Sequence, residues 1–391
     1  MRRGQWQGEF ILDEKPVSGI TPLLTVVGKT VGNPYRLIGN QRKSFLGSKP
    51  SGMGFVLSPE EAQALIEKDP RNQDVLFAYL NGEDLNSRSD QSSSRWIINF
   101  FDWSLDASHD DPKKSKSKSY AVDYPDCLAI VAERVKPERE KKATGNATDR
   151  DEAKRWWQFK RPTIELYEAL AGMNRIIAVP RVSKLLILSF VPANFVFSEQ
   201  LVIFPFDTND FFGLMQSSIH NVWAWEYCST MRDAGIRYAP TDGVETFPFP
   251  LSTSNLEEIG EKYYTHRQSI MLSRQEGLTK TYNRFHNRDE TAADIQQLRS
   301  LHVEMDNAVA AAYGWQGIDL EHDFHETKQG LRYTISETAR REVLDRLLLL
   351  NHERYAEEVA QGLHDKGKKK GKSGGKKKGK TQVSPGQTSL F

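Results

Sequence analysis

The chain has 391 residues, and its 38% hydrophobic and 10% aromatic content is enough to build two or three ordinary domains. The formal net charge of +1 is unevenly distributed, because residues 366–380 (KGKKKGKSGGKKKGK) hold nine of the 53 basic residues and no acid, which leaves 44 basic residues against 52 acidic ones elsewhere. An acidic body excludes a general polyanion binder. Any contact with DNA therefore needs a local basic groove.

No apolar run reaches the roughly 18 residues that a membrane helix needs, and the first residues, MRRGQWQGEF, lack the apolar stretch of a signal peptide. We therefore expect a cytoplasmic protein without membrane contact. The two cysteines, Cys127 and Cys228, stand far apart with no metal-ligand spacing around either. This pattern favours two plain core residues over a disulfide or a zinc site.

The first 57 residues are rich in glycine, proline and basic residues and show no long helical period, so they are typical of a connector or an edge. The stretch SPEEAQALIEKDP then predicts a helix that Ser58 caps and Pro70 stops. Downstream, RWIINFF predicts a strand, YPDCLAIVAERVKPERE a helix that ends near Pro137, and IELYEALAG another helix.

Four β-rich runs follow in close succession: RIIAV, KLLILSF, NFVFS and LVIFPF. The short turn segments between them predict an antiparallel meander rather than a βαβ series. The next segment, TNDFFGLMQSSIHNVWAWEY, predicts one helix with its apolar residues along one side.

Residues 254–362 contain three strongly helical segments, whereas the composition after Asp365 cannot bury a core. The chain is therefore predicted to be an α+β protein, in which a mixed, mainly antiparallel β domain precedes an α-helical domain and a disordered Lys/Gly tail. The predicted limits are 1–57 for the connector, 58–250 for the β-rich domain, 251–364 for the helical domain and 365–391 for the tail.

Catalytic motifs are mostly missing: the sequence has no Gly-rich phosphate loop, no G-x-S-x-G elbow and no His-Glu-x-x-His pair. The nearest metal-like cluster is HDFHE, with His322, His325 and Glu326 in an expected loop, but no third nitrogen or sulfur ligand accompanies it. We favour polar or packing histidines there, with no bound metal. GNPYRL (32–37) is interpreted as an ordinary β-turn at Asn33-Pro34 rather than a catalytic loop.

Basic residues with interleaved aromatics are the better functional signal. Arginine and lysine contact phosphates and guanine edges, and aromatic rings stack or wedge where DNA is distorted. The segment RWWQFKRP places such residues together, although its Trp156 and Trp157 also suit a core. The candidate DNA-contacting residues are Arg155, Lys160, Arg161, Arg181, Lys184, Arg237 and Thr241.

Taken in order, nine segments resemble the C-terminal half of large bacterial DNA adenine-N6 methyltransferases of type IIG and IIL restriction-modification systems and related phage-defence enzymes. These segments are KSFLGSKPSGMGFVLSPEEAQAL, VLFAYLNGEDLNSR, YPDCLAIVAERVKPERE, RWWQFKRPTIELYEAL, PRVSKLLILSFVP, DGVETFPFP, GLTKTYNRFHN, LHVEMDNAVAAAYGW and YTISETARREVLDRLL. The resemblance implies a target-recognition domain over about residues 60–250, with a helical domain packed behind it.

The same resemblance implies that the S-adenosylmethionine loop and the Asn-Pro-Pro-Tyr/Phe loop lie upstream of the segment around Trp6. We therefore expect no cofactor in this chain, no catalytic residue, and a methyltransferase catalytic domain or subunit as its partner beside double-stranded DNA. A split subunit, an internal start and a truncated frame stay open. The alternative is a stand-alone DNA-binding module with no role in methylation.

The last residues, QTSLF, are similar to the short peptides by which bacterial DNA-processing proteins dock on the sliding clamp. In this interpretation Gln387, Leu390 and Phe391 are the anchors, and the lysine-rich segment raises the local concentration of the chain near DNA. The sliding clamp is thus a further candidate partner.

Overall fold

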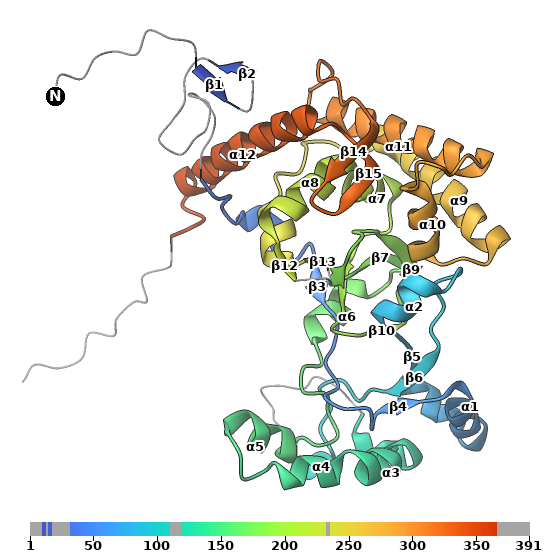
Figure 1. Cartoon of the computed structure of the whole chain (residues 1–391). Coiled ribbons are helices and arrows are strands. Elements are labelled where there is room, and N and C mark those ends of the chain that lie inside the picture. The colour runs from blue at the N-terminus through green and yellow to red at the C-terminus, as the bar shows by residue number, and fades with distance from the viewer. Residues whose placement is uncertain (1–9, 13–14, 18–31, 110–118, 232–234, 366–391) are drawn as a thin grey trace, which may run out of the picture.

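The computed structural model describes residues 10–12, 15–17, 32–109, 119–231 and 235–365. Within these ranges the chain forms two lobes, each around its own cluster of buried apolar side chains (Figure 1). The predicted tail from residue 366 and its proposed anchors Gln387, Leu390 and Phe391 lie outside the described residues. None of the described helices is long and apolar enough to cross a membrane.

The smaller lobe is built on a four-stranded sheet with the order β10-β5-β6-β4. Strand β6 pairs antiparallel with both β4 and β5. The core of this lobe includes Phe55, Ile97 and Phe159. Its elements are β4 (Val56–Leu57), α1 (Pro59–Lys68), β5 (Leu76–Leu80), β6 (Arg95–Ile98), α3 (Pro125–Arg134), α4 (Lys136–Lys141), α5 (Ala147–Lys154) and β10 (Val196–Phe197).

Helix α1 begins where the sequence predicts. The Ser58 side chain accepts a hydrogen bond from the backbone N–H of Glu61, and the Glu61 carboxylate accepts one from the backbone N–H of Ser58. This reciprocal capping box satisfies two N–H groups that a helix start otherwise leaves unpaired. Pro70 begins the next turn of chain, so the predicted stop is also confirmed.

The larger lobe contains a second sheet, with the order β3-β11-β7-β9, and a three-stranded sheet with the order β12-β13-β8. Figure 1 shows the helices α7 to α12 gathered on one side of these strands. The strands are β3 (Phe45–Leu46), β7 (Arg175–Pro180), β8 (Val182–Ser183), β9 (Ser189–Pro192), β11 (Leu201–Phe204), β12 (Ser229–Met231) and β13 (Gly235–Arg237).

The helices of the larger lobe are α2 (Gly82–Ser87), α6 (Ile164–Leu170), α7 (Asn209–Gln216), α8 (Ser218–Tyr227), α9 (Glu257–Arg274), α10 (Leu278–Phe285), α11 (Ala293–Ala312) and α12 (Glu337–Ala360). A hairpin of β14 (Asp323–Thr327) and β15 (Gly330–Thr334) lies between α11 and α12 in the chain, and β1 (Phe10–Leu12) pairs with β2 (Lys15–Val17) near the N-terminus. The predicted α+β class with mainly antiparallel strands is confirmed.

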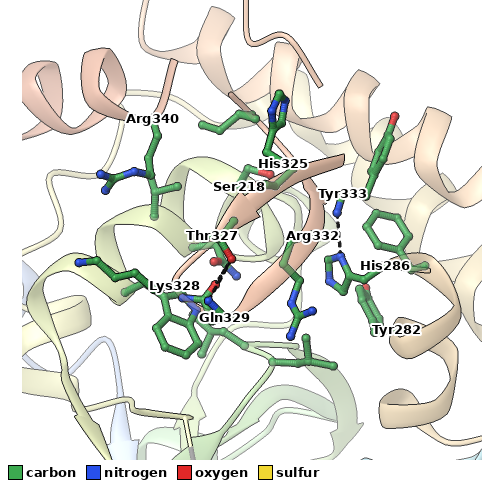
Figure 2. A pocket seen from close by; sticks show the side chains of 18 of the residues that line it. Ser218, Tyr282, His286, His325, Thr327, Lys328, Gln329, Arg332, Tyr333 and Arg340 are labelled. Carbon is green, nitrogen blue, oxygen red and sulfur yellow. Dashed lines mark hydrogen bonds between the residues drawn. The ribbon is translucent and has the colours of Figure 1, made fainter. Parts of the chain in front are cut away.

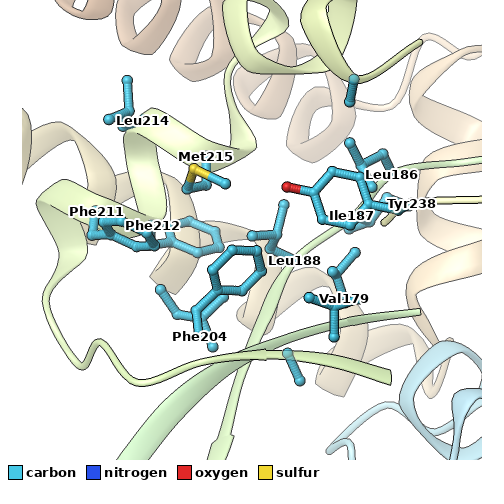
Figure 3. Packing of buried hydrophobic residues seen from close by; sticks show 14 of the residues in the cluster. Val179, Leu186, Ile187, Leu188, Phe204, Phe211, Phe212, Leu214, Met215 and Tyr238 are labelled. Atoms are coloured by element: carbon cyan, nitrogen blue, oxygen red, sulfur yellow. The ribbon is translucent and has the colours of Figure 1, made fainter. Parts of the chain in front are cut away.

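One continuous core joins the second sheet to the helices. Figure 3 shows Val179 and Phe204 from the sheet converging on Phe212 and Met215 of α7. The α7–α9 crossing is close, because a Cβ added to Gly260 would lie 2.1 Å from the backbone oxygen of Asn209. This core contains residues on both sides of position 250. The domain limits predicted from the sequence, 1–57, 58–250, 251–364 and 365–391, stay a prediction.

The predicted four-strand meander is wrong. Strand β7 is central, with β9 and β11 antiparallel on either side of it, while residues 196–197 leave this sheet and pair in parallel with β5 as β10. The apolar run at 184–188 is not a strand, although Leu186, Ile187 and Leu188 are buried. These residues are apolar because they are buried in an irregular segment, and their apolar pattern was interpreted as that of a strand.

Two predicted helices are each divided in the structure. The segment after Thr208 breaks at Ser217, whose side chain accepts a hydrogen bond from the backbone N–H of His220 and caps α8. The helix expected to end near Pro137 instead ends at Arg134, and Pro137 stands in the first turn of α4. Both positions suit their residues, since serine is a good cap and proline is tolerated at a helix start.

Candidate nucleic-acid interface

A groove of about 590 Å³ lies on the larger lobe, and we call it the basic groove. The end of β7, the turn before β11 and the start of α2 contribute to it. Its lining residues are Lys49, Gly82, Glu83, Asn86, Pro180, Arg181, Val182, Glu199, Gln200 and Arg237. Three of these residues are cations and two, Glu83 and Glu199, are carboxylates, so the lining has the small local excess of positive charge that an acidic body needs in order to meet DNA.

The backbone around Arg181 is fixed on both sides. Its N–H donates to the backbone oxygen of Gln200 at 2.7 Å, and its own backbone oxygen accepts from the N–H of Tyr238 at 2.7 Å. Gly235 allows β13 to approach β8, because its φ is +95° and an added Cβ would lie 2.2 Å from the oxygen of Ser183. Arg237 in β13 pairs with Val182 in β8, so Arg237 lies close to Arg181, which joins β7 to β8.

The positive charge of this groove is only partly neutralised. The Glu199 carboxylate pairs with Lys49 Nζ at 2.8 Å and with the Arg161 guanidinium at 3.4 Å. Burial, followed by the charges of Arg237 and Arg161, lowers the pKa of Arg181, and Glu199 offsets this only in part. The Arg181 Nε is buried and has no hydrogen-bond partner among the described residues. A poorly solvated guanidinium near other cations is a strong site for an anion or an acceptor group.

The structure brings together only some of the predicted contact residues. Arg181 and Arg237 line the basic groove, and Arg161 lies close enough to act on the charge of Arg181. Their role in DNA contact stays a prediction. The sequence analysis missed three other residues of this groove, Asn86, Gln200 and Lys49. Pairing between distant strands brings them to the groove, and no local sequence motif indicates it.

The other predicted residues lie elsewhere. Arg155 pairs with Asp151 and Lys160 pairs with Glu152, both at α5 of the smaller lobe. Lys184 lines a different cavity, beneath the β14–β15 hairpin. The Thr241 hydroxyl donates to the carboxylate of the adjacent Asp242 at 2.9 Å. None of these four residues lines the basic groove.

The segment RWWQFKRP is held from within by Arg139. The Arg139 guanidinium donates to the backbone oxygens of Arg155, Trp156 and Gln158, and also to that of Pro50. Burial lowers the pKa of Arg139, and its side chain is 5% exposed. A buried arginine that binds main-chain oxygens orders a loop, and this role has no signature in the sequence around it.

The aromatic residues of this segment behave as packing residues. Trp157 is buried and its indole N–H donates to the backbone oxygen of Trp103 at 2.9 Å, while Trp156 is partly buried beside it. Cys127 and Cys228 are also buried, with free thiols whose pKa values burial raises to about 12 and about 11. The expectation that these cysteines are core residues is confirmed.

The HDFHE segment is not a loop, because Asp323–Thr327 forms β14. The Nε2 atom of His322 lies 2.8 Å from the carboxylate of Asp306, and the Nε2 atom of His325 lies 2.8 Å from the backbone oxygen of Glu321. Both rings thus have partners within the protein. In the part of the chain that the structure describes, no group of three or more potential metal ligands comes together.

The Asn33-Pro34 segment is also different from the expectation of a β-turn. Residues 33–37 form no turn, and the backbone N–H and oxygen of Tyr35 bond with the side chain of Asn351 in α12. The Tyr35 ring stacks on Tyr355 with centroids 4.1 Å apart. Long-range docking on a helix therefore replaces the local turn.

Ser218, His302 and Asp306 have the composition of a hydrolytic triad but not its geometry. The Ser218 hydroxyl and the Asp306 carboxylate both lie near Nε2 of His302, at 3.0 and 3.5 Å, while Nδ1 is buried without a partner among the described residues. A working triad places the nucleophile and the carboxylate on opposite nitrogens of the histidine. The arrangement is consistent with a structural cluster, in which burial lowers the pKa of His302.

Comparison with known proteins places this fold in a class of DNA-recognition modules. Residues 30–251 match the family model described as MmeI, target recognition domain, and this match covers more than half of the chain. The chain therefore belongs to this family. No protein in a search of curated sequences matches.

A solved structure of the type IIL restriction-modification enzyme MmeI in complex with DNA is similar to this chain, with a TM-score of 0.57 and 18% sequence identity. The similarity covers 88% of this chain and 39% of that one. It shows a shared fold that extends beyond the family match into the helices of the larger lobe. The chain thus spans well under half the length of the solved relative.

Proposed function

We propose that this chain recognises a specific sequence in double-stranded DNA, as the target-recognition part of a type IIL-like restriction-modification or phage-defence enzyme. The observation that carries the proposal is the basic groove, where Arg181 and Arg237 lie beside Glu199, whose carboxylate already pairs with Lys49 and Arg161. Membership of a target-recognition family supports it, as does a relative of the same fold solved with DNA.

The groove offers both kinds of contact that sequence recognition needs. Phosphate contacts fix the protein on the duplex, and side chains at base edges read the sequence. A guanidinium binds the O6 and N7 atoms of guanine in two parallel hydrogen bonds, and asparagine or glutamine pairs in the same way with adenine. We assign base contact to Arg181, with Asn86 and Gln200 beside it, and phosphate contact to Arg161 and Arg237.

The chemistry is proposed to reside in a separate catalytic half. An adenine-N6 methyltransferase domain or subunit would bind S-adenosylmethionine and act on a base flipped out of the duplex. Transfer of a tritiated methyl group to DNA by a mixture of this chain and such a subunit would support the assignment. A mixture that stays inactive would leave only the role of a DNA-binding module without methylation.

We predict that Arg181→Ala weakens binding to the preferred duplex by about 1–3 kcal/mol and relaxes the preference at one base pair. Binding is measured by titration of labelled duplexes at a fixed salt concentration, since affinity depends steeply on salt. Arg71→Ala is the matched control, because Arg71 is exposed, pairs with Asp69 and lies outside the groove. An equal loss on every sequence would contradict base recognition by Arg181.

Docking of Gln387, Leu390 and Phe391 on the sliding clamp remains a separate proposal that rests on the sequence alone. A pull-down with purified clamp before and after removal of the last five residues tests it. Capture that is unchanged by the deletion would remove the clamp from the set of partners.

A further inference from the structure

A second cavity, of about 320 Å³, lies beneath the β14–β15 hairpin, and we call it the hairpin cavity (Figure 2). Helices α8 and α10 and the segment at 184–187 form its other sides. It lies across β8 from the basic groove, because Arg181 and Val182 line the groove and Lys184 lines the cavity. Its volume is at the lower end of the range of small-molecule sites.

Aromatic rings form much of the wall of the hairpin cavity. They come from Trp225 of α8, Tyr282 and Phe285 of α10, and Tyr333 of β15. The hydroxyl groups of Tyr282 and Tyr263 lie 2.7 Å apart in the core, and the rings of Phe285 and Tyr333 meet edge to face at 5.5 Å. The wall is therefore held in place before any ligand arrives, and its flat apolar faces suit a planar ring.

Arg332 is a partly buried cation of this cavity. The Arg332 guanidinium donates to the backbone oxygen of Leu331 at 2.9 Å, and no carboxylate of the described residues lies within 4.0 Å of it. Burial lowers the pKa of Arg332. By contrast, Arg340 at the rim pairs with Glu226 and Glu337. A partly desolvated guanidinium without a counter-ion is a good site for an anion, because a charge-assisted hydrogen bond offsets its desolvation.

His286 adds a neutral donor beside this arginine. Its Nδ1 accepts a hydrogen bond from the backbone N–H of Tyr333 at 3.2 Å, so the proton of the neutral ring is assigned to Nε2. Burial, together with the charge of Arg332, lowers the pKa of His286 to about 3, and the ring is neutral at physiological pH. Figure 2 shows Arg332 and His286 reaching into the space below the hairpin, with Lys328 at its edge.

We propose that the hairpin cavity binds a nucleotide, with its phosphate on Arg332 and its base against the aromatic wall. Lys184 and Lys328 are exposed and extend the positive charge at the mouth, while Glu326 is the carboxylate there that pairs with no cation of the described residues. The nucleotide is either free in solution or an unpaired residue of a DNA strand. This site does not depend on duplex recognition by the basic groove.

The test is titration calorimetry of the full chain with each of the four deoxynucleoside monophosphates, and with deoxyadenosine and inorganic phosphate separately. At least one monophosphate is expected to bind about tenfold or more tightly than phosphate alone or the nucleoside alone, because only it uses both halves of the cavity. If none of the four monophosphates binds at millimolar concentration, the proposal is wrong.

Arg332→Gln is expected to weaken this binding about tenfold or more, whereas the control Arg71→Gln should leave it unchanged. The melting temperature of Arg332→Gln should stay close to that of the wild type, since Arg332 makes one hydrogen bond to the adjacent residue and none across the fold among the described residues. Equal affinity of the folded Arg332→Gln variant would overturn the assignment.

Competition distinguishes the two sources of the nucleotide. A duplex with an unpaired base that displaces the bound monophosphate assigns the cavity to DNA, and a monophosphate that remains bound assigns it to a free nucleotide. Weakened duplex binding by Arg181→Ala, with monophosphate binding intact, separates this site from the basic groove. Monophosphate binding that is lost in Arg181→Ala but kept in Arg332→Gln would place the ligand in the groove and refute the proposal.

Discussion

Replacing Asp306 by alanine is expected to lower the free energy of unfolding by about 2–6 kcal/mol, because two buried donors lose their acceptor and each costs about 1–3 kcal/mol. The Asp306 carboxylate is fully buried and accepts hydrogen bonds from the backbone N–H of Ser218 at 2.7 Å and from His322 at 2.8 Å. It thus joins α11 to the first turn of α8 and to the start of the hairpin. Its charge also lies at the positive end of α8. Denaturant unfolding measures the change.

Asp306→Asn is the matched variant, because it keeps the volume but replaces one acceptor by a donor. Burial opposes the charge of Asp306, but His302, His322 and Ser218 together hold its pKa below the usual 3.8. A lowered pKa in the folded state gives stability that is complete above the unfolded value and is lost as the pH falls through the folded value. The difference between wild type and Asp306→Asn should therefore shrink below about pH 4. A difference independent of pH would contradict a charged Asp306.

The second large effect is expected at Arg139, where Arg139→Ala should cost about 3 kcal/mol or more. Its two shortest hydrogen bonds, to the backbone oxygens of Gln158 and Pro50, measure 2.7 and 2.8 Å, and a bond from a charged donor contributes about 1.5–3 kcal/mol. The smaller lobe should lose its order around Trp157 first. Thermal or denaturant unfolding and tryptophan fluorescence both measure this.

The control for Arg139→Ala is Arg71→Ala, whose exposed ion pair should be worth no more than about 1 kcal/mol. Equal stability losses for the two variants would show that the main-chain contacts of Arg139 do not order the lobe. Arg139→Lys adds a further test, because a lysine keeps the charge but loses the planar set of donors that reaches several backbone oxygens.

The sequence was most informative where structure is locally determined. The capping residue Ser58, the long helices after residue 254 and the buried Trp157 all follow from patterns within a single turn or a single face. The class of the fold and the family could be predicted for the same reason. Family segments and helical periodicity can be recognised in the sequence without knowledge of tertiary contacts.

What could not be predicted depends on residues that are distant in the chain. The parallel pairing of β10 with β5 joins Val196 to Tyr79, and no pattern near either residue indicates it. The same long-range contacts bring Lys49 and Gln200 to the groove and separate Lys184 from Arg181. The buried Asp306 and Arg139 look like surface charges in the sequence, because only the fold supplies their partners.

The function that we propose for the basic groove is to read a DNA sequence. The most direct test is to select bound molecules from a pool of random duplexes and sequence them, using the wild-type chain and a variant carrying Arg161→Ala, Arg181→Ala and Arg237→Ala. We predict that the wild-type chain enriches one short motif, and that the variant binds weakly, with a shallower dependence on salt and no motif. Enrichment of the same motif by the folded variant would contradict this account.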